Sequence, residues 1–313
     1  MNRLRIYQDL RFREHPAGEI HIESPKRLRA VAEAFDKSDV LCDAEFSDGI
    51  LCESAQMELA HAPEYIAHLK RWCDLSEFIP SAEIELSPKS WVAIQAAAGS
   101  CIDAVQSALD GDIDCAFVAP RPPGHHAEYR RPLGFCMINN IAIAASYALK
   151  NGVGKVAILD FDLHHGNGTQ NIFWNNPNAL FMSFHQDRLF PLTTGTTQEQ
   201  GGLDALGMTI NLPLQPGVGD EILPGMFEDV INPAIKNYQP EMIFLSAGFD
   251  GHKDDILGNL QFTEDGFRWI TQQALKWASD LKCPIVSVLE GGYTLESLAS
   301  SALVHCETLL LGK

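Results

Sequence analysis

Short apolar runs alternate with longer amphipathic segments through most of this chain. The runs are rich in Val, Ile, Leu and Phe, as expected for strands buried on both faces of a sheet. They predict strands at residues 115–119, 156–159, 179–184, 208–212, 242–245 and 284–289. The amphipathic segments predict helices at residues 25–36, 61–72, 88–109, 138–149, 170–175, 220–238, 263–280 and 295–311. The alternation predicts an α/β fold, with a parallel sheet and helices on both of its faces.

Two stretches show neither the apolar runs typical of strands nor the amphipathic pattern typical of helices. Residues 1–25 have the mixed composition of a long surface segment, and residues 79–85 are irregular. The chain contains no internal repeat, low-complexity segment or linker, and its 313 residues suffice for a sizeable core. We therefore expect a single domain over residues 1–313.

Composition and charge narrow the classes of partner. The net charge of −18 argues against nucleic acid and against an anionic membrane surface, and suits either solubility or a cationic substrate. The eight cysteines form no close pair, and several lie in apolar runs, as in a reducing compartment. No apolar targeting segment or membrane-length run is evident, so we expect a cytoplasmic protein that could form a homo-oligomer.

Residues that can bind metal follow the strand predicted at 156–159. Asp160, Asp162, His164 and His165 fall within six positions, before Gly166-Asn167-Gly168. In extended chain, residues two apart point the same way, so Asp162 and His164 emerge together. Together with a carboxylate from another strand, they would hold a metal ion with one position open to water. The same residues also fit a strand that simply ends in a polar loop.

Reactive side chains follow four other predicted strands. They are His125 with His126, His185, Asp250 and Tyr293. In an open parallel sheet, ligands bind in the crevice beyond the carboxyl ends of the strands. Each residue alone has a structural alternative: a surface histidine pair, a helix-capping Asp250, or a packed Tyr293. Their shared position favours a site.

Five segments, in order, resemble the signature blocks of the histone deacetylase superfamily. They are RPPGHHAE (121–128), GFCMINN (134–140), LDFDLHHGNGT (159–169), LSAGFD (245–250) and EGGY (290–293). The superfamily includes bacterial deacetylase-like amidohydrolases and acetylpolyamine amidohydrolases, and the EGGY and HHGNGT variants are closer to its class II branch. The resemblance implies an arginase-like three-layer α/β/α fold with a central parallel sheet of about eight strands.

The resemblance also implies catalytic roles. Asp162, His164 and Asp250 would bind a catalytic zinc, with iron(II) as the alternative ion. His126 would be the main general base and acid, and His125 would pair with Asp160. Asn167 stands where class I members have an aspartate, which should leave His126 less biased towards its protonated form. Tyr293 would donate a hydrogen bond to the developing oxyanion.

Further residues match the family's cation and substrate sites. Asp160 and Ser183, with backbone near Phe184 and His164, match a structural monovalent-cation site, expected to hold potassium. In the acyl-lysine channel, Gly134 and Phe135 would form one side and Phe190 the facing aromatic wall, although Phe190 also fits ordinary packing.

Three positions bear on substrate choice. Arg27 matches an arginine at the inner end of the pocket near the acetate exit, and its alternative is an exposed helix charge. Glu83 stands near the position of the acidic residue that grips the substrate backbone. Leu257 occupies the position where polyamine-selective relatives carry a glutamate.

These residues favour a zinc-dependent amidohydrolase that removes acyl groups from lysine side chains or similar N-acyl amines. The alternatives are an acetylpolyamine amidohydrolase, an arginase-like dimanganese hydrolase and a catalytically silent binder of acylated ligands. The sequence lacks the additional His and Asp motifs of the second, and its intact reactive residues argue against the third.

Overall fold

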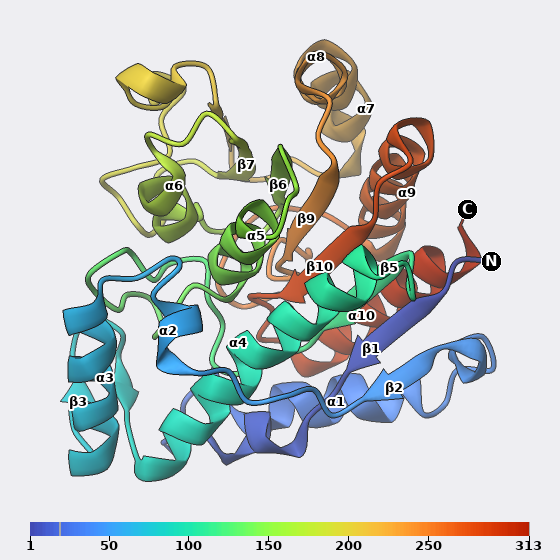
Figure 1. Cartoon of the computed structure of the whole chain (residues 1–313). Helices are drawn as coiled ribbons and strands as arrows, with labels where there is room; N and C mark the ends of the chain where they lie inside the picture. The colour runs from blue at the N-terminus through green and yellow to red at the C-terminus, as the bar shows by residue number, and fades with distance from the viewer. Residues whose placement is uncertain (19, 313) are drawn as a thin grey trace.

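The centre of the molecule is an eight-stranded sheet in which all neighbouring strands are parallel (Figure 1). The computed structural model describes residues 1–18 and 20–312. The strands are β1 (Leu4–Tyr7), β2 (Glu45–Ser47), β5 (Cys115–Val118), β6 (Val156–Asp160), β7 (Ala179–Gln186), β8 (Thr209–Leu214), β9 (Met242–Ala247) and β10 (Ile285–Leu289). Their order is β2-β1-β5-β10-β9-β6-β7-β8. The predicted parallel sheet and its six strands are confirmed, with boundary shifts of a few residues.

The N-terminal segment corrects the prediction of a surface loop. β1 pairs with β2 on one side and β5 on the other, and Leu4, Ile6 and Tyr7 are buried. Arg3 precedes the strand and Arg5 interrupts its apolar run, which hides the strand in the sequence. Arg5 reaches the edge of the sheet, where its guanidinium lies 3.0 Å from the carboxylate of Glu45.

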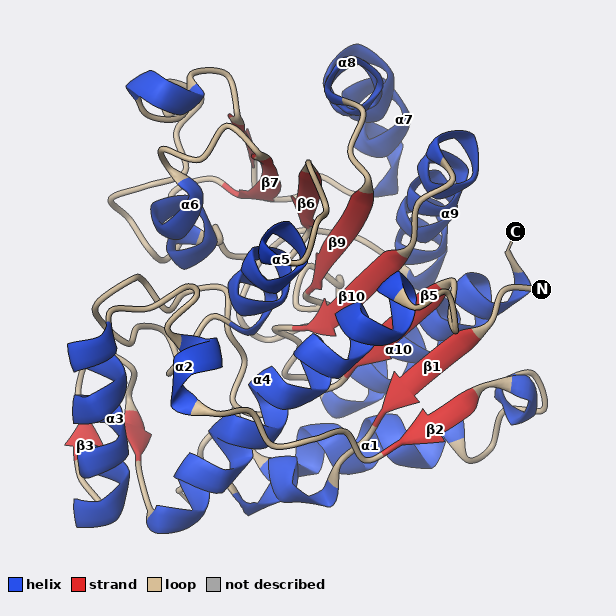
Figure 2. Cartoon of the chain, viewed as in Figure 1, coloured by secondary structure: helices blue, strands red, loops and turns tan. Residues whose placement is uncertain are grey.

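Helices cover both faces of the sheet, as predicted (Figure 2). In the view shown, α4 (Pro88–Leu109) and α5 (Asn140–Lys150) lie in front, and α1 (Pro25–Phe35), α9 (Glu264–Leu281) and α10 (Leu295–Leu311) lie behind. The two chain ends lie side by side, because the Asn2 amide donates to the carbonyl of Leu310 over 2.8 Å. The remaining α-helices are α2 (Ser54–Met57), α3 (Pro63–Leu75), α6 (Asn167–Phe173), α7 (Leu223–Met226) and α8 (Asn232–Tyr238).

α4 is the one described helix that is long and apolar enough to cross a membrane, with a mean hydropathy of 1.2 over its most apolar window. Within that window, 72% of the residues are buried inside the protein, as in a core helix. The side chain of Ser87 caps its first turn by accepting from the Ser90 amide, and Pro88 occupies the first helical position.

The helix predicted at residues 220–238 is present as one continuous helical segment, but its hydrogen-bond pattern changes along its length. A 3₁₀ turn at Asp220–Ile222 is followed by α7, a π-helical turn at Phe227–Ile231, and α8. Pro233 has no amide hydrogen to donate to the carbonyl four residues earlier, and the Asn232 amide bonds to Phe227 instead, which widens the turn. Residues 79–85, expected to be irregular, contribute to a small antiparallel pair, β3 (Phe78–Ile79) and β4 (Ile84–Glu85).

The sheet topology brings four distant parts of the sequence to one place. β5, β10, β9 and β6 are consecutive strands at the centre of the sheet, and all four run in the same direction. Their carboxyl ends therefore meet at one edge, which places the loops that follow residues 118, 289, 247 and 160 next to one another.

Candidate active site

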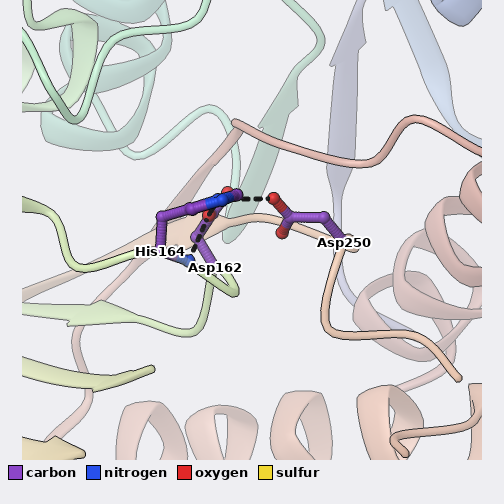
Figure 3. Close-up of side chains that lie close together, drawn as sticks. All are labelled: Asp162, His164 and Asp250. Atoms are coloured by element: carbon purple, nitrogen blue, oxygen red, sulfur yellow. Dashed lines mark hydrogen bonds and ion pairs between the residues drawn. The ribbon is translucent and has the colours of Figure 1, made fainter. Parts of the chain in front are cut away.

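Three side chains that can bind metal converge at this edge (Figure 3). Asp162 and His164 follow β6, and Asp250 follows β9. All three are buried, and one ligand atom from each lies within 4.8 Å of the other two. Nδ1 of His164 is 3.2 Å from Oδ1 of Asp162 and 3.0 Å from Oδ2 of Asp250. The three residues predicted as ligands therefore form one cluster.

Backbone groups hold the two carboxylates in place. The Gly291 amide donates to Oδ2 of Asp162 over 2.7 Å, and the Leu163 amide donates to Oδ1 of Asp250 over 2.9 Å. Gly291 also leaves room for them, because a Cβ there would lie 2.3 Å from Oδ2 of Asp250. The glycine of the EGGY segment is thus required by the close approach of two aspartates.

The charges in this cluster fit a divalent cation. Burial and the nearby Asp162 raise the pKa of Asp250 to about 6. Burial acts to lower the pKa of His164, but its hydrogen bonds to Asp162 and Asp250 outweigh that effect and raise the pKa to about 9. Two buried carboxylates therefore surround a group that attracts a proton. An imidazole and two carboxylates are the mixed nitrogen and oxygen donors that zinc or iron(II) accepts, so the residues fit such an ion.

The two histidines after β5 lie beside this cluster, with ring centroids 4.0 Å apart. Nδ1 of His125 is 3.1 Å from Oδ2 of Asp160, and Nδ1 of His126 is 2.8 Å from Oδ1 of Asn167. Both pairings are those that the family resemblance implies. The ring of His126 also approaches that of His164, at 5.9 Å between centroids.

The surroundings push the pKa values of the two histidines apart. Burial would lower the pKa of His125, but Asp162 and Asp160 outweigh it and raise the pKa to about 10. The pKa of His126 falls well below its ordinary value because of burial and the positive charges of His125 and His164. These shifts favour a protonated His125 and a neutral His126. Burial and neighbouring charge are the main causes of the low pKa of His126, whereas its hydrogen bond to Asn167 acts to raise the pKa. The expectation that Asn167 leaves His126 less biased towards its protonated form than an aspartate would stays a prediction.

Tyr293 follows β10 and lies beside the predicted channel. Its ring is 5.9 Å from that of Phe135, edge to face. The buried guanidinium of Arg27 lies 5.0 Å above the same ring. Arg27 donates from Nε to the Gly292 carbonyl over 2.6 Å and from Nη2 to the Glu290 carbonyl. The alternative of an exposed helix charge is therefore wrong for Arg27.

The channel residues are placed around the histidine pair. Gly134 has φ of +51°, and a Cβ there would lie 2.5 Å from Cδ2 of His126 and 2.8 Å from Cε1 of Phe190. Phe190 is 40% exposed, and its ring lies 5.0 Å from that of His126. The exposure of Phe190 argues against an ordinary core role, and a side chain at Gly134 would fill the space between these rings.

Residues at the rim are tied to Phe135 and Tyr293. The Phe135 amide donates to the carbonyl of Ala82, next to the exposed Glu83. Leu257 is partly buried, and its amide donates to Oδ1 of Asp255 over 3.1 Å. Oδ2 of Asp255 accepts from the Tyr293 amide over 2.7 Å, so one carboxylate connects the Leu257 loop to Tyr293.

Two of the predicted positions lie behind this edge. Asp160 pairs in sheet register with Ser183, whose hydroxyl lies 2.9 Å from Nδ1 of His185. His185 contacts the Gly195 carbonyl and the ring of His165, so it belongs to a separate polar network and not to the metal cluster. The monovalent-cation role of Asp160 and Ser183 stays a prediction.

Two glutamates in the site were not identified from the sequence. Glu290 is fully buried, and its Oε2 accepts from the amides of Gly124 (2.6 Å) and His125 (3.1 Å), which ties the loop after β10 to the histidine loop. Burial raises its pKa to about 7. Glu128 accepts from Nδ2 of Asn167 over 2.9 Å. The available signal was position, because both lie inside the quoted segments, next to residues that were assigned roles.

Comparison with known proteins identifies the histone deacetylase family. A family model described as the histone deacetylase domain matches residues 21–309. The chain is 34% identical to Histone deacetylase 5 of Arabidopsis thaliana over 95% of this chain and 47% of that protein. It is 31% identical to the Histone deacetylase-like amidohydrolase of Pseudomonas aeruginosa over 89% of this chain and 74% of that protein. The chain thus spans about half the length of the Arabidopsis relative.

A solved structure shows the same architecture. The crystal structure of the HDA15 HD domain superposes with a TM-score of 0.92 at 32% sequence identity. The superposition covers 98% of this chain and 88% of the other. This similarity confirms the predicted arginase/deacetylase-like α/β fold.

Proposed function

The chain belongs to the histone deacetylase family, and we propose that it is a zinc-dependent deacylase that hydrolyses the amide of acyl-lysine side chains or of similar N-acyl amines. Membership of the family supports a hydrolase that acts on amide bonds. The observation that carries the proposal is the buried Asp162–His164–Asp250 cluster beside two histidines with opposite pKa shifts.

Asp162, His164 and Asp250 would hold the zinc ion in this proposal. When bound, zinc would polarise the acyl carbonyl and lower the pKa of water at the site. The Gly291 and Leu163 amides hold in place the two carboxylates that would bind the ion. Asp160 and Ser183 would support this arrangement from behind, around a potassium ion.

His126 would transfer the protons of the reaction. As a neutral imidazole, it can accept a proton from the attacking water and deliver it to the leaving amine. The carboxylates of Asp160 and Asp162 would stabilise the protonated form of His125, which then places a positive charge next to His126. The two histidines would thus divide the work: one moves protons and the other supplies a fixed charge.

Tyr293 would stabilise the oxyanion. Burial raises the pKa of Tyr293 well above its ordinary value, so the phenol keeps its proton and remains a donor. Arg27 holds the backbone that carries Tyr293 through its bonds to Gly292 and Glu290. Gly134, Phe135 and Phe190 would enclose the acyl-lysine chain, with Leu257 at the mouth. A single domain and a cytoplasmic location remain part of this proposal.

Hydrolysis of an acetyl-lysine peptide and of an acetylated polyamine, measured side by side, tests the proposal. Each substrate is assayed with the protein as purified, after removal of metal by a chelator, and after zinc is added back. We expect peptide hydrolysis that is lost with the chelator and restored by zinc. Preference for the polyamine would identify an acetylpolyamine amidohydrolase that uses the same catalytic residues. Absence of zinc-dependent turnover of both substrates would contradict the proposal.

A further inference from the structure

We propose that Glu128 is a positioning residue for His126: its carboxylate sets which way the Asn167 amide faces, and the amide sets which ring nitrogen of His126 carries the hydrogen. This inference rests on the proposed function of His126 as the proton-transferring group. It assigns a role to a glutamate that lies outside the metal cluster and does not touch it.

The residues form a continuous chain of hydrogen bonds from the histidine to the surface. Oδ1 of Asn167 lies 2.8 Å from Nδ1 of His126, and Nδ2 of Asn167 donates to Oε1 of Glu128 over 2.9 Å. Glu128 in turn accepts from Nε and Nη2 of Arg131, over 2.8 and 2.9 Å. The first two side chains are buried, Glu128 is 19% exposed and Arg131 is 58% exposed.

The chemistry of the partners selects one orientation of the amide. An asparagine side chain has a donor end and an acceptor end of nearly the same shape, so a neighbour must decide between them. A carboxylate offers only acceptors. With the amide reversed, Oδ1 of Asn167 would face the carboxylate of Glu128, and a hydrogen bond would be replaced by repulsion between two acceptors. Nδ2 of Asn167 also donates to the backbone carbonyl of His126, over 3.4 Å, so Glu128 is the nearer of two acceptors that direct Oδ1 towards His126.

The amide orientation then fixes the tautomer of His126. Because Oδ1 can only accept, Nδ1 of His126 must carry the hydrogen. The lone pair is left on Nε2, which makes no hydrogen bond with the described residues. Nε2 is thus the nitrogen available for proton transfer. The opposite tautomer would place the hydrogen on the reacting nitrogen and could not accept a proton there.

Glu128 is itself held in a fixed position. A tight turn, closed by the Glu128 amide and the Arg131 carbonyl at 3.0 Å, brings the two side chains together. The carbonyl of Glu128 accepts from Nδ1 of the buried His61 over 3.0 Å, and Nε2 of His61 accepts from the Asn139 amide over 2.8 Å. The bidentate pairing with Arg131 orients the carboxylate as well as its charge.

Four variants test this inference through hydrolysis. Glu128→Ala leaves the amide only its longer bond to the His126 carbonyl, and kcat is expected to fall by about tenfold with little change in KM, as for other supporting partners of catalytic histidines. Glu128→Gln keeps an acceptor oxygen and should lose less. Asn167→Asp sets a carboxylate against Glu128 and should lose about tenfold or more. The double variant E128Q/N167D gives that carboxylate an amide donor and should recover most of the loss.

Glu64→Ala is the matched control. It removes the exposed ion pair with Arg130, which is adjacent to Arg131 in sequence, and should leave the activity unchanged.

A spectroscopic measurement tests the inference without depending on turnover. In zinc-loaded protein labelled with ¹⁵N-histidine, His126 is expected to show the Nδ1–H tautomer, and Glu128→Ala should give a mixture of tautomers. An unchanged tautomer in Glu128→Ala would overturn the inference. So would an Asn167→Asp loss of the same size with and without the Glu128→Gln substitution. A wild-type protein with the Nδ1–H tautomer but without hydrolysis would refute the proposed function and leave this inference standing.

Discussion

At the carboxyl edge of the sheet, His125 and His164 are buried against carboxylates, whereas His305 of α10 is buried against hydroxyls and aromatic rings. Nδ1 of His305 lies 2.7 Å from the hydroxyl of Thr271, and Nε2 lies 2.9 Å from that of Ser287. The rings of Phe117, Phe161 and Phe249 surround it, with centroids 5.6–6.2 Å away. Burial lowers the pKa of His305 to about 3, while the pKa values of His125 and His164 rise to about 10 and 9.

All three histidines are buried, and burial acts to lower the pKa of each, so the difference between their pKa values comes from their partners. Hydroxyls can donate or accept, so they satisfy a neutral ring at either nitrogen. Carboxylates only accept, so they favour a proton or another cation at the nitrogen that faces them. The carboxylates at the edge therefore favour positively charged rings at His125 and His164, and the hydroxyls between the sheet and α10 suit a neutral ring at His305.

Removal of a carboxylate from the edge should have the largest effect. Asp250→Asn takes one negative charge from the cluster, and we expect bound zinc to be lost and hydrolysis to fall by at least about a thousandfold, since the charge stabilisation that a metal supplies amounts to several kcal/mol. Metal content per chain and turnover are measured together. His305→Asn is the control and should retain its metal. Full zinc occupancy in Asp250→Asn would contradict the assignment of the ligand.

Removal of a donor from the edge, without a change of charge, should have the next largest effect. Tyr293→Phe is expected to lower kcat by about 10²–10³, as for the loss of one oxyanion donor, while metal content stays the same. Steady-state kinetics and metal analysis of the same preparation check this result. A variant with unchanged kcat would assign Tyr293 to packing against Phe135 and Arg27 alone.

The neutral His305 should have a smaller effect, which is a dependence of the free energy of unfolding on pH. Below its ordinary pKa of 6.5, His305 takes up a proton in the unfolded chain, but in the folded chain it does so only near pH 3. The unfolded state thus binds more protons in this window, and stability is lost as the pH falls from about 6.5 towards 3. At pH 5, the loss from this one residue is about 2 kcal/mol.

Urea unfolding at pH 7 and pH 5 measures this contribution. His305→Asn should show a smaller decrease in the free energy of unfolding than the wild type, by about that amount, whatever its absolute stability. Other titrating groups contribute equally to both proteins and cancel. Equal decreases in the two proteins would mean that His305 is not kept neutral by its surroundings.

The parts of the fold that could be predicted were those with a local cause. Continuous apolar runs identified six of the eight strands of the sheet, and the rule for parallel strands placed Asp162, His164 and Asp250 at one edge. β1 was missed because it has only four residues, with Arg3 before it and Arg5 within it, and because it is defined by pairing with β2 and β5 on either side. The π-helical turn at Phe227–Ile231 depends on the register of hydrogen bonds before Pro233, which periodicity does not show.

Within the site, the residues with roles set by distant partners could not be predicted. The burial of Arg27 depends on the Gly292 and Glu290 carbonyls, which lie more than 260 positions away in sequence. Glu128 and Glu290 act on amides and histidines across loops, so their partners are defined only once the strands are assembled. The type of a residue indicates which groups it can bind, whereas the order of the strands determines which groups it contacts.

The place of β10 in the sheet has a consequence for how the chain is made. β10 lies between β5 and β9, so without it the sheet divides into β2-β1-β5 and β9-β6-β7-β8. The histidine pair belongs to the first part and the three metal ligands to the second. During synthesis from the N-terminus, both parts emerge before the strand that joins them. Until residues 285–289 insert, β5 and β9 each present an unpaired edge, open to association with other chains. The histidine pair and the three metal-binding side chains are thus brought together only after β10, the last of the eight strands to be synthesised, has inserted between β5 and β9.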